Sequence, residues 1–490
     1  MRKKSILIAC GVALALAGAV ARAENLLEVY QAAVKGDPLI REAEARRMAA
    51  LEAKPQARSL LLPQVNVNGQ IYTANSDGES TFPQVDRNTG NIVTVGNRSS
   101  TDVDQYWDYS AQLTQTVFRW DQWQSLQRAD SSVALAEANY RAAQQDLMVR
   151  VSQAYFEVLA AEDTLAAAEA TAQAFARQLE QAEKRFEVGL IAITDVQEAR
   201  AANDSAIAGV ILAKRVFAGT QERLRELTGD SYASLVKPAD DMPLDQPQPL
   251  DEQHWVDQAL EQNLDVIAAR LGVDLAKRDV KIAQSGYMPT VDLFAQYGET
   301  NRDATQTNQS FDPSNSGLQG DPVRGSADSE TTNDAVGLRV NIPVFKSGGT
   351  SSRVREQVYL HRAAREKLEG SQRGAERATR DAYLGVIAEK ARVAALKQAV
   401  KSNQTALEAT EAGFEVGTRT TVDVLDARRR LFESQRDYAR SRYDYLINLV
   451  KLKSASGVLA PQDLNTINGY LTTPTTLPTV RPAPATPPAG

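Results

Sequence analysis

The side chains of this chain that are most suited to binding ions are acidic and basic residues near two expected glycine turns. Asp423 and Asp426 lie three residues apart near the expected start of a helix, so both carboxylates can project from one helix face. Such a pair attracts cations, but the helix dipole also favours negative charge at this position in any helix. The residues alone leave both interpretations open.

Few other side chains suit catalysis or metal binding. The chain has two histidines, His254 and His361, and a single cysteine, Cys10. It has no Gly-rich phosphate-binding loop and no recognisable nucleophile motif. We therefore expect no enzymatic activity, no cofactor and no metal site, and we expect both histidines to be surface or packing residues.

The N-terminus has the pattern of an export signal. Residues 2–4 are basic, residues 5–20 form an apolar run, and residues 21–23 have the small-x-small spacing of a cleavage site. Cys10 also fits a lipoprotein pattern, but cleavage there would leave almost no apolar segment before it. We expect a signal peptide over residues 1–23, cleaved after Ala23, and a mature chain without disulfides.

Charge and hydropathy limit the partners of the mature chain. Residues 1–23 hold four basic and no acidic residues, so their removal lowers the formal net charge from −7 to −11. Nucleic acid is therefore not an expected partner. After the signal, no apolar stretch approaches the roughly 20 residues that a membrane-spanning helix needs. If the chain enters a membrane, it must do so as strands.

The two halves of the chain repeat each other. The clearest matches join residues 62–65 to 288–291 and residues 186–189 to 414–417. All matches are collinear, and their offset stays between 226 and 228 residues. We expect two structural repeats, 24–229 and 252–457, with a linker at 230–251 between them.

Each repeat contains a very long predicted helix. Residues 119–188 hold no proline or glycine, and their apolar residues recur at three- and four-residue steps. About 65 residues at 1.5 Å each would span roughly 100 Å. The second half repeats this pattern from Ser351 to about Ala412. Abundant small residues favour coiled-coil packing between such helices, and a soluble helical rod is the alternative.

Four stretches alternate with the period of a strand. They cover about 64–74, 105–118, 290–299 and 334–345. Their apolar residues fall on one face and their polar residues on the other, with Phe294 as the exception. Each is about as long as the 9–11 residues that a tilted strand needs to cross a bilayer. We expect long loops at about 75–104 and 300–333, and a half-buried soluble sheet is the alternative.

Four strands cannot close a membrane barrel, because known small barrels need about eight. Two chains would give eight strands and a filled interior, whereas three would give twelve and space for an aqueous passage. A pore therefore favours a homotrimer. A periplasmic adaptor or a coiled-coil filament would also use long helical hairpins, but the duplicated outward-apolar strands argue against both.

Several motifs resemble the TolC family of outer-membrane efflux and secretion ducts. They are the segments 24–26, 61–64, 188–197, 416–427, 445–448 and 462–464. The resemblance covers the mature chain up to about Asn468 and leaves out a Pro/Thr-rich tail, 471–490, which we expect to be disordered. It implies a mainly α fold with a trimeric 12-stranded barrel, continued by a long coiled-coil α-helical periplasmic barrel. A small mixed α/β equatorial region would come from 230–251 and 458–470.

The resemblance also implies a function. The chain would form a passive exit duct for tripartite drug efflux or type I protein secretion, without chemistry or cofactor. The implied partners are two further copies of the chain, a periplasmic membrane-fusion adaptor, an inner-membrane RND, ABC or MFS-type transporter, and outer-membrane lipid. The duct is implied to open by movement of the helix tips at its periplasmic entrance.

Two Phe-Glu-Val-Gly segments are expected to form those tips, because each lies where a long helix ends. Gly189 and Gly417 permit the left-handed turn that reverses the chain into the next helix. In a trimer, Asp423 and Asp426 would form two rings of three carboxylates, which match the acidic entrance of the family. The resemblance therefore favours a cation-attracting gate over simple helix-terminal charge.

The resemblance further implies a latch between neighbouring helix tips. Arg419 would hydrogen-bond and ion-pair with Thr194 and Asp195 to hold the tips closed. Phe414 departs from the family, whose best-known members carry a tyrosine there. A phenylalanine cannot donate the hydrogen bond of that tyrosine, so we expect the latch to rest more heavily on Arg419.

Overall fold

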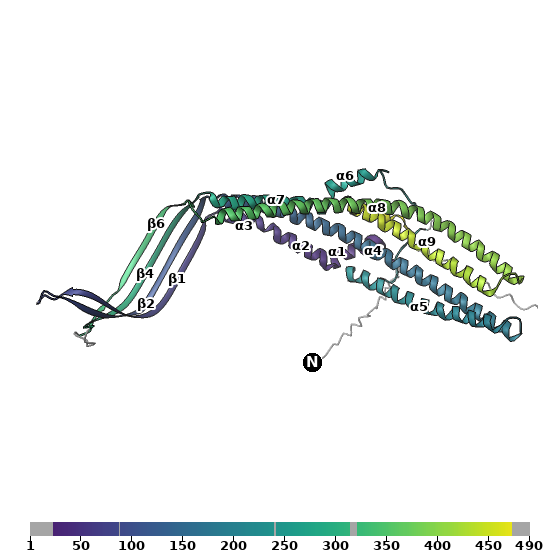
Figure 1. The fold of residues 1–490 in the computed structure, drawn as a ribbon, viewed down its shortest axis with the longest axis horizontal. Helices are drawn as coiled ribbons and strands as arrows, with labels where there is room; N and C mark the ends of the chain where they lie inside the picture. The colour runs from purple at the N-terminus through teal and green to yellow at the C-terminus, as the bar shows by residue number, and fades with distance from the viewer. Residues whose placement is uncertain (1–22, 88, 240–241, 314–320, 473–490) are drawn as a thin grey trace, which may run out of the picture. The chain divides into compact units, whose positions relative to one another are not determined.

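The computed structural model of the chain describes residues 23–87, 89–239, 242–313 and 321–472 (Figure 1). Residues 1–22 of the expected signal peptide and residues 473–490 of the expected tail lie outside the described residues. The chain divides into two compact units. One combines residues 48–135 with 271–365, and the other combines the remaining described residues.

The first unit contains an antiparallel sheet (Figure 1). Its main strands are β1 (Gln64–Val85), β2 (Ile92–Phe118), β4 (Thr290–Phe311) and β6 (Ser329–Asn341), and β5 (Val323–Ser326) is short. β1 pairs with β2, β2 pairs with β4, and β4 pairs with both β5 and β6. The central pairing of β2 with β4 therefore joins the two halves of the chain.

The strands extend beyond the alternating stretches. Most of residues 75–104 and 300–311, which we expected to form loops, continue the ladder between β1, β2 and β4. Backbone pairing does not require apolar side chains, so polar Thr, Ser and Asn residues prolong the strands after the alternation ends. β6 instead stops at Asn341, before Pro343, which has no N–H to donate to a ladder.

The two outer strands of the sheet are open to solvent within one chain. Every residue of β1 is exposed, and the apolar side chains Val67 and Val336 are 72% and 78% exposed. Among the described residues, no strand pairs with the outer edge of β1 or of β6. This exposure argues against a half-buried soluble sheet, which would cover its apolar face.

Phe294, the exception to the alternation, has a packing role on the polar face. It lies directly opposite Gly337 in the register of β4 and β6. Its ring covers the glycine, where a Cβ would lie only 3.1 Å from the ring atoms. The Arg339 guanidinium stacks above the same ring, 5.0 Å from its centroid. An aromatic side chain thus fills the space that the glycine leaves in the sheet.

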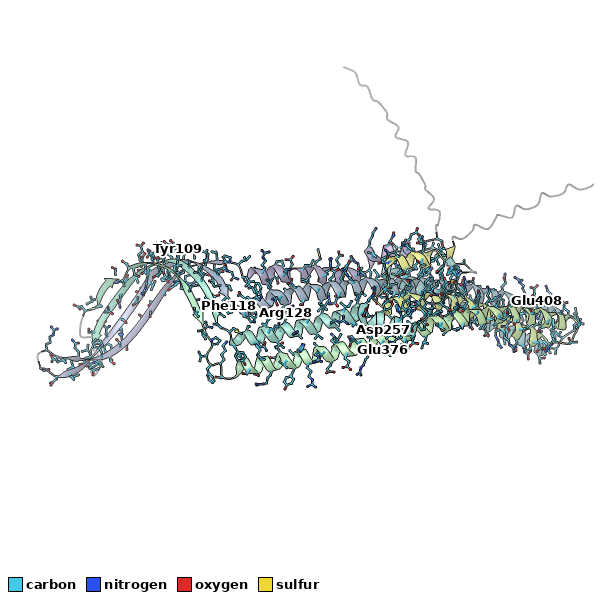
Figure 2. All side chains as sticks on the ribbon, turned by 90° about the horizontal axis from the view of Figure 1, so that it is seen from above. Tyr109, Phe118, Arg128, Asp257, Glu376 and Glu408 are labelled. Atoms are coloured by element: carbon cyan, nitrogen blue, oxygen red, sulfur yellow. The ribbon has the colours of Figure 1, made fainter. Side chains whose placement is uncertain are left out.

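Polar contacts fix the strands and the helix that follows them. The Arg119 guanidinium donates to both carboxylate oxygens of buried Asp292 at 3.1 and 2.9 Å, where β2 gives way to a helix. Within the sheet, the Tyr109 hydroxyl donates to Glu299 at 2.6 Å (Figure 2). Bidentate arginine pairs constrain orientation as well as distance, so Arg119 fixes the end of the strand.

Two very long helices, α4 (Trp120–Glu187) and α8 (Gly349–Glu415), follow the expected pattern with 68 and 67 residues. In the first unit α4 runs beside α7 (Leu264–Gln284), and polar pairs set their register. The Arg128 Nε donates to Asp279 at 2.5 Å, and the Ser131 hydroxyl donates to Asp274 at 3.0 Å (Figure 2). This unit also contains α3 (Ala53–Ser59) and the short 3-10 helix η1 (Ser285–Tyr287).

The second unit is mainly helical. Its further elements are α1 (Leu26–Gly36), α2 (Pro38–Leu51), α5 (Ile193–Thr228), β3 (Lys237–Pro238), α6 (Glu252–Gln262), α9 (Thr421–Ala455), α10 (Pro461–Asn468) and β7 (Leu471–Thr472). β7 pairs with β3, so the first two residues assigned to the tail belong to a strand.

None of the helices in the described part of the chain combines the length and the apolar character needed to span a membrane.

The core of this unit holds the linker between the two halves against α4 and α9. The Tyr155 hydroxyl donates to the Val236 carbonyl, and the Tyr445 hydroxyl donates to the Asp245 carbonyl, both at 2.7 Å. Burial raises the pKa of Tyr445 to about 12. The hydroxyl groups of these buried tyrosines therefore donate hydrogen bonds to backbone carbonyls of the irregular linker.

Asp163 of α4 is a second anchor, because it binds two elements that are distant in sequence. It accepts hydrogen bonds from the Tyr443 hydroxyl of α9 at 2.5 Å and from the Lys237 Nζ of β3 at 2.7 Å. Burial, and then the nearby Asp163 carboxylate, raise the pKa of the Tyr443 hydroxyl, which stays a donor. Asp163 thus joins α4, α9 and the linker.

Tyr443→Phe should destabilise this unit. It removes one donor from a partly buried carboxylate, and hydrogen bonds to charged groups contribute about 1.5–3 kcal/mol. We expect the thermal midpoint of the purified protein in detergent, followed by circular dichroism, to fall by several degrees. Tyr359→Phe is the control, because the Tyr359 side chain is 67% exposed. Equal midpoints for the two variants would contradict the assignment of Asp163 as an anchor.

Candidate functional site at the helix tips

The turns at the ends of α4 and α8 have the same geometry. After α4, the Leu190 N–H donates to the Arg185 carbonyl at 2.8 Å, and the Gly189 N–H donates to the Phe186 carbonyl at 2.9 Å. After α8, Thr418 and Gly417 donate in the same way to Gly413 and Phe414 at 2.8 and 3.1 Å. Gly189 and Gly417 have φ of 76° and 78°. Each is a Schellman turn, in which glycine takes the left-handed conformation.

The helices that follow the turns begin differently. α5 begins after Ala192, which offers no side-chain cap. α9 begins after Thr420, which forms a capping box with Asp423: the Thr420 N–H donates to Asp423 Oδ2 at 2.9 Å, and the Asp423 N–H donates to Thr420 Oγ1 at 3.3 Å. The start of α9 is therefore the more firmly fixed of the two.

The two predicted gate carboxylates have different surroundings in one chain. Asp423 turns back to Thr420, and hydrogen bonds from the Thr420 backbone and hydroxyl hold its pKa below the usual value. Asp426 accepts a hydrogen bond from Arg429 at 2.9 Å, and 40% of its side chain remains exposed. Asp423 thus caps its helix, and Arg429 offsets part of the charge of Asp426. Sequence reasoning missed Arg429, although its three-residue spacing from Asp426 is a detectable signal.

Arg419 lies exposed in the turn before α9, and Gly413 provides the space beside it. A Cβ at position 413 would lie 2.8 Å from Arg419 Cγ, and the Arg419 N–H donates to the Gly413 carbonyl at 3.2 Å. Thr194 is exposed and Asp195 is half-buried, both at the start of α5. Among the described residues of one chain, no hydrogen bond or ion pair joins Arg419 to Thr194 or Asp195. The contact that we expected between neighbours therefore requires a second copy.

Phe414 has a cationic neighbour that sequence reasoning also missed. Its half-buried ring packs on a small cluster of Leu407, Val424 and Leu431. The guanidinium of Arg185, from the other helix tip of the same chain, lies 4.8 Å from the ring centroid. The only signal in the sequence was an arginine directly before the first Phe-Glu-Val-Gly segment. This position is occupied by glycine before the second segment.

In the described part of the chain, the two histidines lie away from the helix tips and form no metal site. His254 is exposed on α6, and His361 is partly exposed on α8. Among the described residues, no three histidine, cysteine or acidic side chains form a group that could hold a metal ion. The charged residues at the helix tips therefore remain the candidate functional site.

The chain is similar to known proteins over nearly its whole length. The family model "Outer membrane efflux protein" matches residues 29–230 and again residues 255–458. Outer membrane protein TolC of Escherichia coli K12 is 35% identical over 491 residues, covering 99% of this chain and 92% of that protein. The alkaline protease secretion protein AprF of Pseudomonas aeruginosa is 25% identical to this chain, and the match covers 90% of this chain and 86% of that protein.

Solved structures of outer-membrane channels have a similar fold. VceC from Vibrio cholerae has a TM-score of 0.65 at 21% identity, covering 88% of this chain and 96% of that one. The CmeC channel of Campylobacter jejuni has a TM-score of 0.66 at 16% identity, covering 92% of this chain and 90% of that one. These likenesses confirm the predicted fold class, and the family model confirms the resemblance in sequence. The chain therefore belongs to the outer membrane efflux protein family.

Proposed function

We propose that three copies of this chain form a passive exit duct across the outer membrane and the periplasm. The main support for this proposal is the sheet, which is not closed within one chain. Among the described residues, its outer edges on β1 and β6 have unpaired backbone groups, and many of its apolar side chains are exposed. In hydrocarbon, each unpaired backbone group costs several kcal/mol, so the sheet must close on further copies of itself.

The number of copies follows from the size of the passage. Four long strands per chain would give a twelve-stranded barrel in a trimer, which is wide enough for water, whereas a dimer would give a filled barrel. The helices α4, α5, α8 and α9 would supply a periplasmic tunnel of twelve. The proposed repeats 24–229 and 252–457 would each contribute one strand pair and one helical hairpin.

The duct would perform no chemistry. A periplasmic adaptor and an inner-membrane transporter would supply energy and select the cargo, and docking would move the helix tips at the periplasmic entrance. The secretion protein AprF and the efflux protein BepC of Brucella suis, both similar to this chain, support a role in protein secretion or drug efflux. Cleavage after Ala23 would release the chain for insertion in the outer membrane.

Cell fractionation tests this proposal. We expect the mature chain in the outer-membrane fraction as a heat-labile, SDS-resistant trimer that forms channels in planar lipid bilayers. A chain without residues 1–23 is the matched control and should stay in the cytoplasm. Recovery of the mature chain as a soluble periplasmic monomer would contradict the duct and favour an adaptor or a coiled-coil filament.

The acidic residues at the start of α9 would line the closed entrance. A trimer places three copies of Asp423 and Asp426 around one axis, and rings of like charge raise the local cation concentration. Both carboxylates are partly exposed, although each has a partner within its own chain. The capping box and the Arg429 pair would hold them in position without removing their negative potential.

The double variant Asp423→Asn, Asp426→Asn should abolish block by multivalent cations. Asparagine can still accept the Thr420 hydrogen bond, so the helix start should survive while six charges leave the trimer. In planar bilayers we expect the concentration of a trivalent cation that halves the current to rise about tenfold or more, as expected when charge-focused binding is lost. Asp204→Asn, on α5, is the control. Unchanged block in the double variant would rule out the acidic entrance.

Arg419→Ser should open the entrance. Among the described residues, Arg419 is exposed and forms no hydrogen bond or ion pair with a carboxylate of its own chain, although electrostatic attraction links it to Asp423. Its guanidinium can therefore bind Thr194 and Asp195 of a neighbouring copy. We expect a several-fold rise in single-channel conductance. Arg430→Ser removes the same charge from α9 and should leave the conductance near the wild-type level. Conductance that stays at the wild-type level in both variants would refute the latch.

A further inference from the structure

We propose that Arg185 and Phe414 form a cation–π latch within each chain, which holds the two helix tips of one protomer together. This inference rests on the proposed duct, because it assigns a gating role to a contact at its entrance. The Arg185 guanidinium lies 4.8 Å from the centroid of the Phe414 ring. This distance is well within the roughly 6 Å range over which an aromatic ring attracts a cation.

The two Schellman turns place both partners. The Arg185 carbonyl accepts the Leu190 N–H after α4, and the Phe414 carbonyl accepts the Gly417 N–H after α8. Each partner therefore belongs to the last hydrogen-bonded turn of its helix, immediately before the reversal. Because each partner is fixed by the turn of its own helix, a movement that separates the two tips must break the contact between Arg185 and Phe414.

The surroundings of the pair favour a cation–π contact over other roles for either residue. The Phe414 ring is held from one side by the Leu407, Val424 and Leu431 cluster, so its orientation is constrained. Among the described residues no carboxylate forms an ion pair with Arg185, although Lys184 beside it pairs with Glu180. The ring face is thus the partner of the guanidinium, and phenylalanine supplies it without a hydroxyl.

The contact is not duplicated in the other half of the chain. Phe186 is the repeat equivalent of Phe414 and is 42% exposed, and the equivalent of Arg185 is Gly413. Gly413 instead makes room for the Arg419 side chain. The second tip therefore carries the arginine that faces a neighbouring copy, and the first tip carries the arginine that binds within the chain.

Packing between the two hairpins is loose next to the latch. A cavity of about 330 Å³ lies between α4 and the second hairpin, lined by Ala170, Ala174, Leu407, Glu411, Arg428 and Phe432. A second cavity of about 580 Å³ lies nearer to Asp163 and Tyr443. The small alanine side chains of α4 do not fill these spaces, so few side chains of the two hairpins interdigitate there. The Asp163 anchor and the Arg185 contact therefore lie at opposite ends of a weakly packed region, about 22 residues or roughly 33 Å apart along α4.

A double-mutant cycle in planar bilayers tests the latch on the full-length protein. Arg185→Gln and Phe414→Leu should each raise the open probability or the mean conductance by at least about two- to tenfold, the range that one cation–π contact supplies, because a trimer loses three copies of the contact. The double variant should open no more than either single variant, because both remove the same contact. Arg185→Lys should retain part of the closure, and Phe414→Trp should strengthen it because tryptophan attracts cations more strongly.

The outcomes separate the latch from the duct and from misfolding. Circular dichroism and SDS-resistant assembly identify any variant that fails to fold. If Arg185→Gln or Phe414→Leu fails to fold, Arg185→Lys and Phe414→Trp test the latch instead. Multiplicative effects of the two single variants would overturn the latch, as would wild-type opening in Arg185→Gln. A wild-type protein that forms no channel would overturn the duct and the latch together, whereas a wild-type channel with unchanged variants would overturn the latch alone.

Discussion

Unsatisfied backbone hydrogen bonding at the two outer edges of the sheet governs the architecture of this protein. Among the described residues, β1 and β6 each have one unpaired edge, and most of their apolar side chains are exposed. In a bilayer only closed barrels satisfy such strands, so the proposed duct requires further copies of the chain. In that proposed assembly every residue is copied around an axis, and the single charged side chains at the helix tips would become rings.

Besides their hydrophobic core, the long helices are held by specific polar contacts. Arg128 with Asp279 sets the register of α4 against α7, and Asp163 joins α4 to α9 and the linker. Alanine-rich stretches between such points leave cavities instead of interlocked cores. This distribution of contacts suits a gate, because helices with local anchors and loose packing can shift relative to each other without unfolding.

The charges at the tips combine local and assembly roles. Asp423 caps α9 and Asp426 binds Arg429, so both carboxylates are positioned before any assembly occurs. Arg419 is packed against Gly413 but keeps its guanidinium exposed, whereas Arg185 is directed to Phe414. In the proposed duct, helix-terminal charge and gating charge are therefore compatible, because the contacts within one chain fix the carboxylates that the proposed gate requires.

The class of fold, the long helices and the glycine turns could be predicted from the amino-acid sequence, because each depends on local periodicity or on a conformation that only glycine adopts readily. The spacing of Asp423 and Asp426 singled out that pair, whereas Arg419 and Phe414 were singled out by the resemblance to the family. The true strand lengths could not be predicted, since polar residues pair as well as apolar ones through their backbone. The partners of Arg185, Asp163 and Phe294 became visible in the folded chain alone, because those contacts join residues from separate elements and leave no periodic pattern in the sequence.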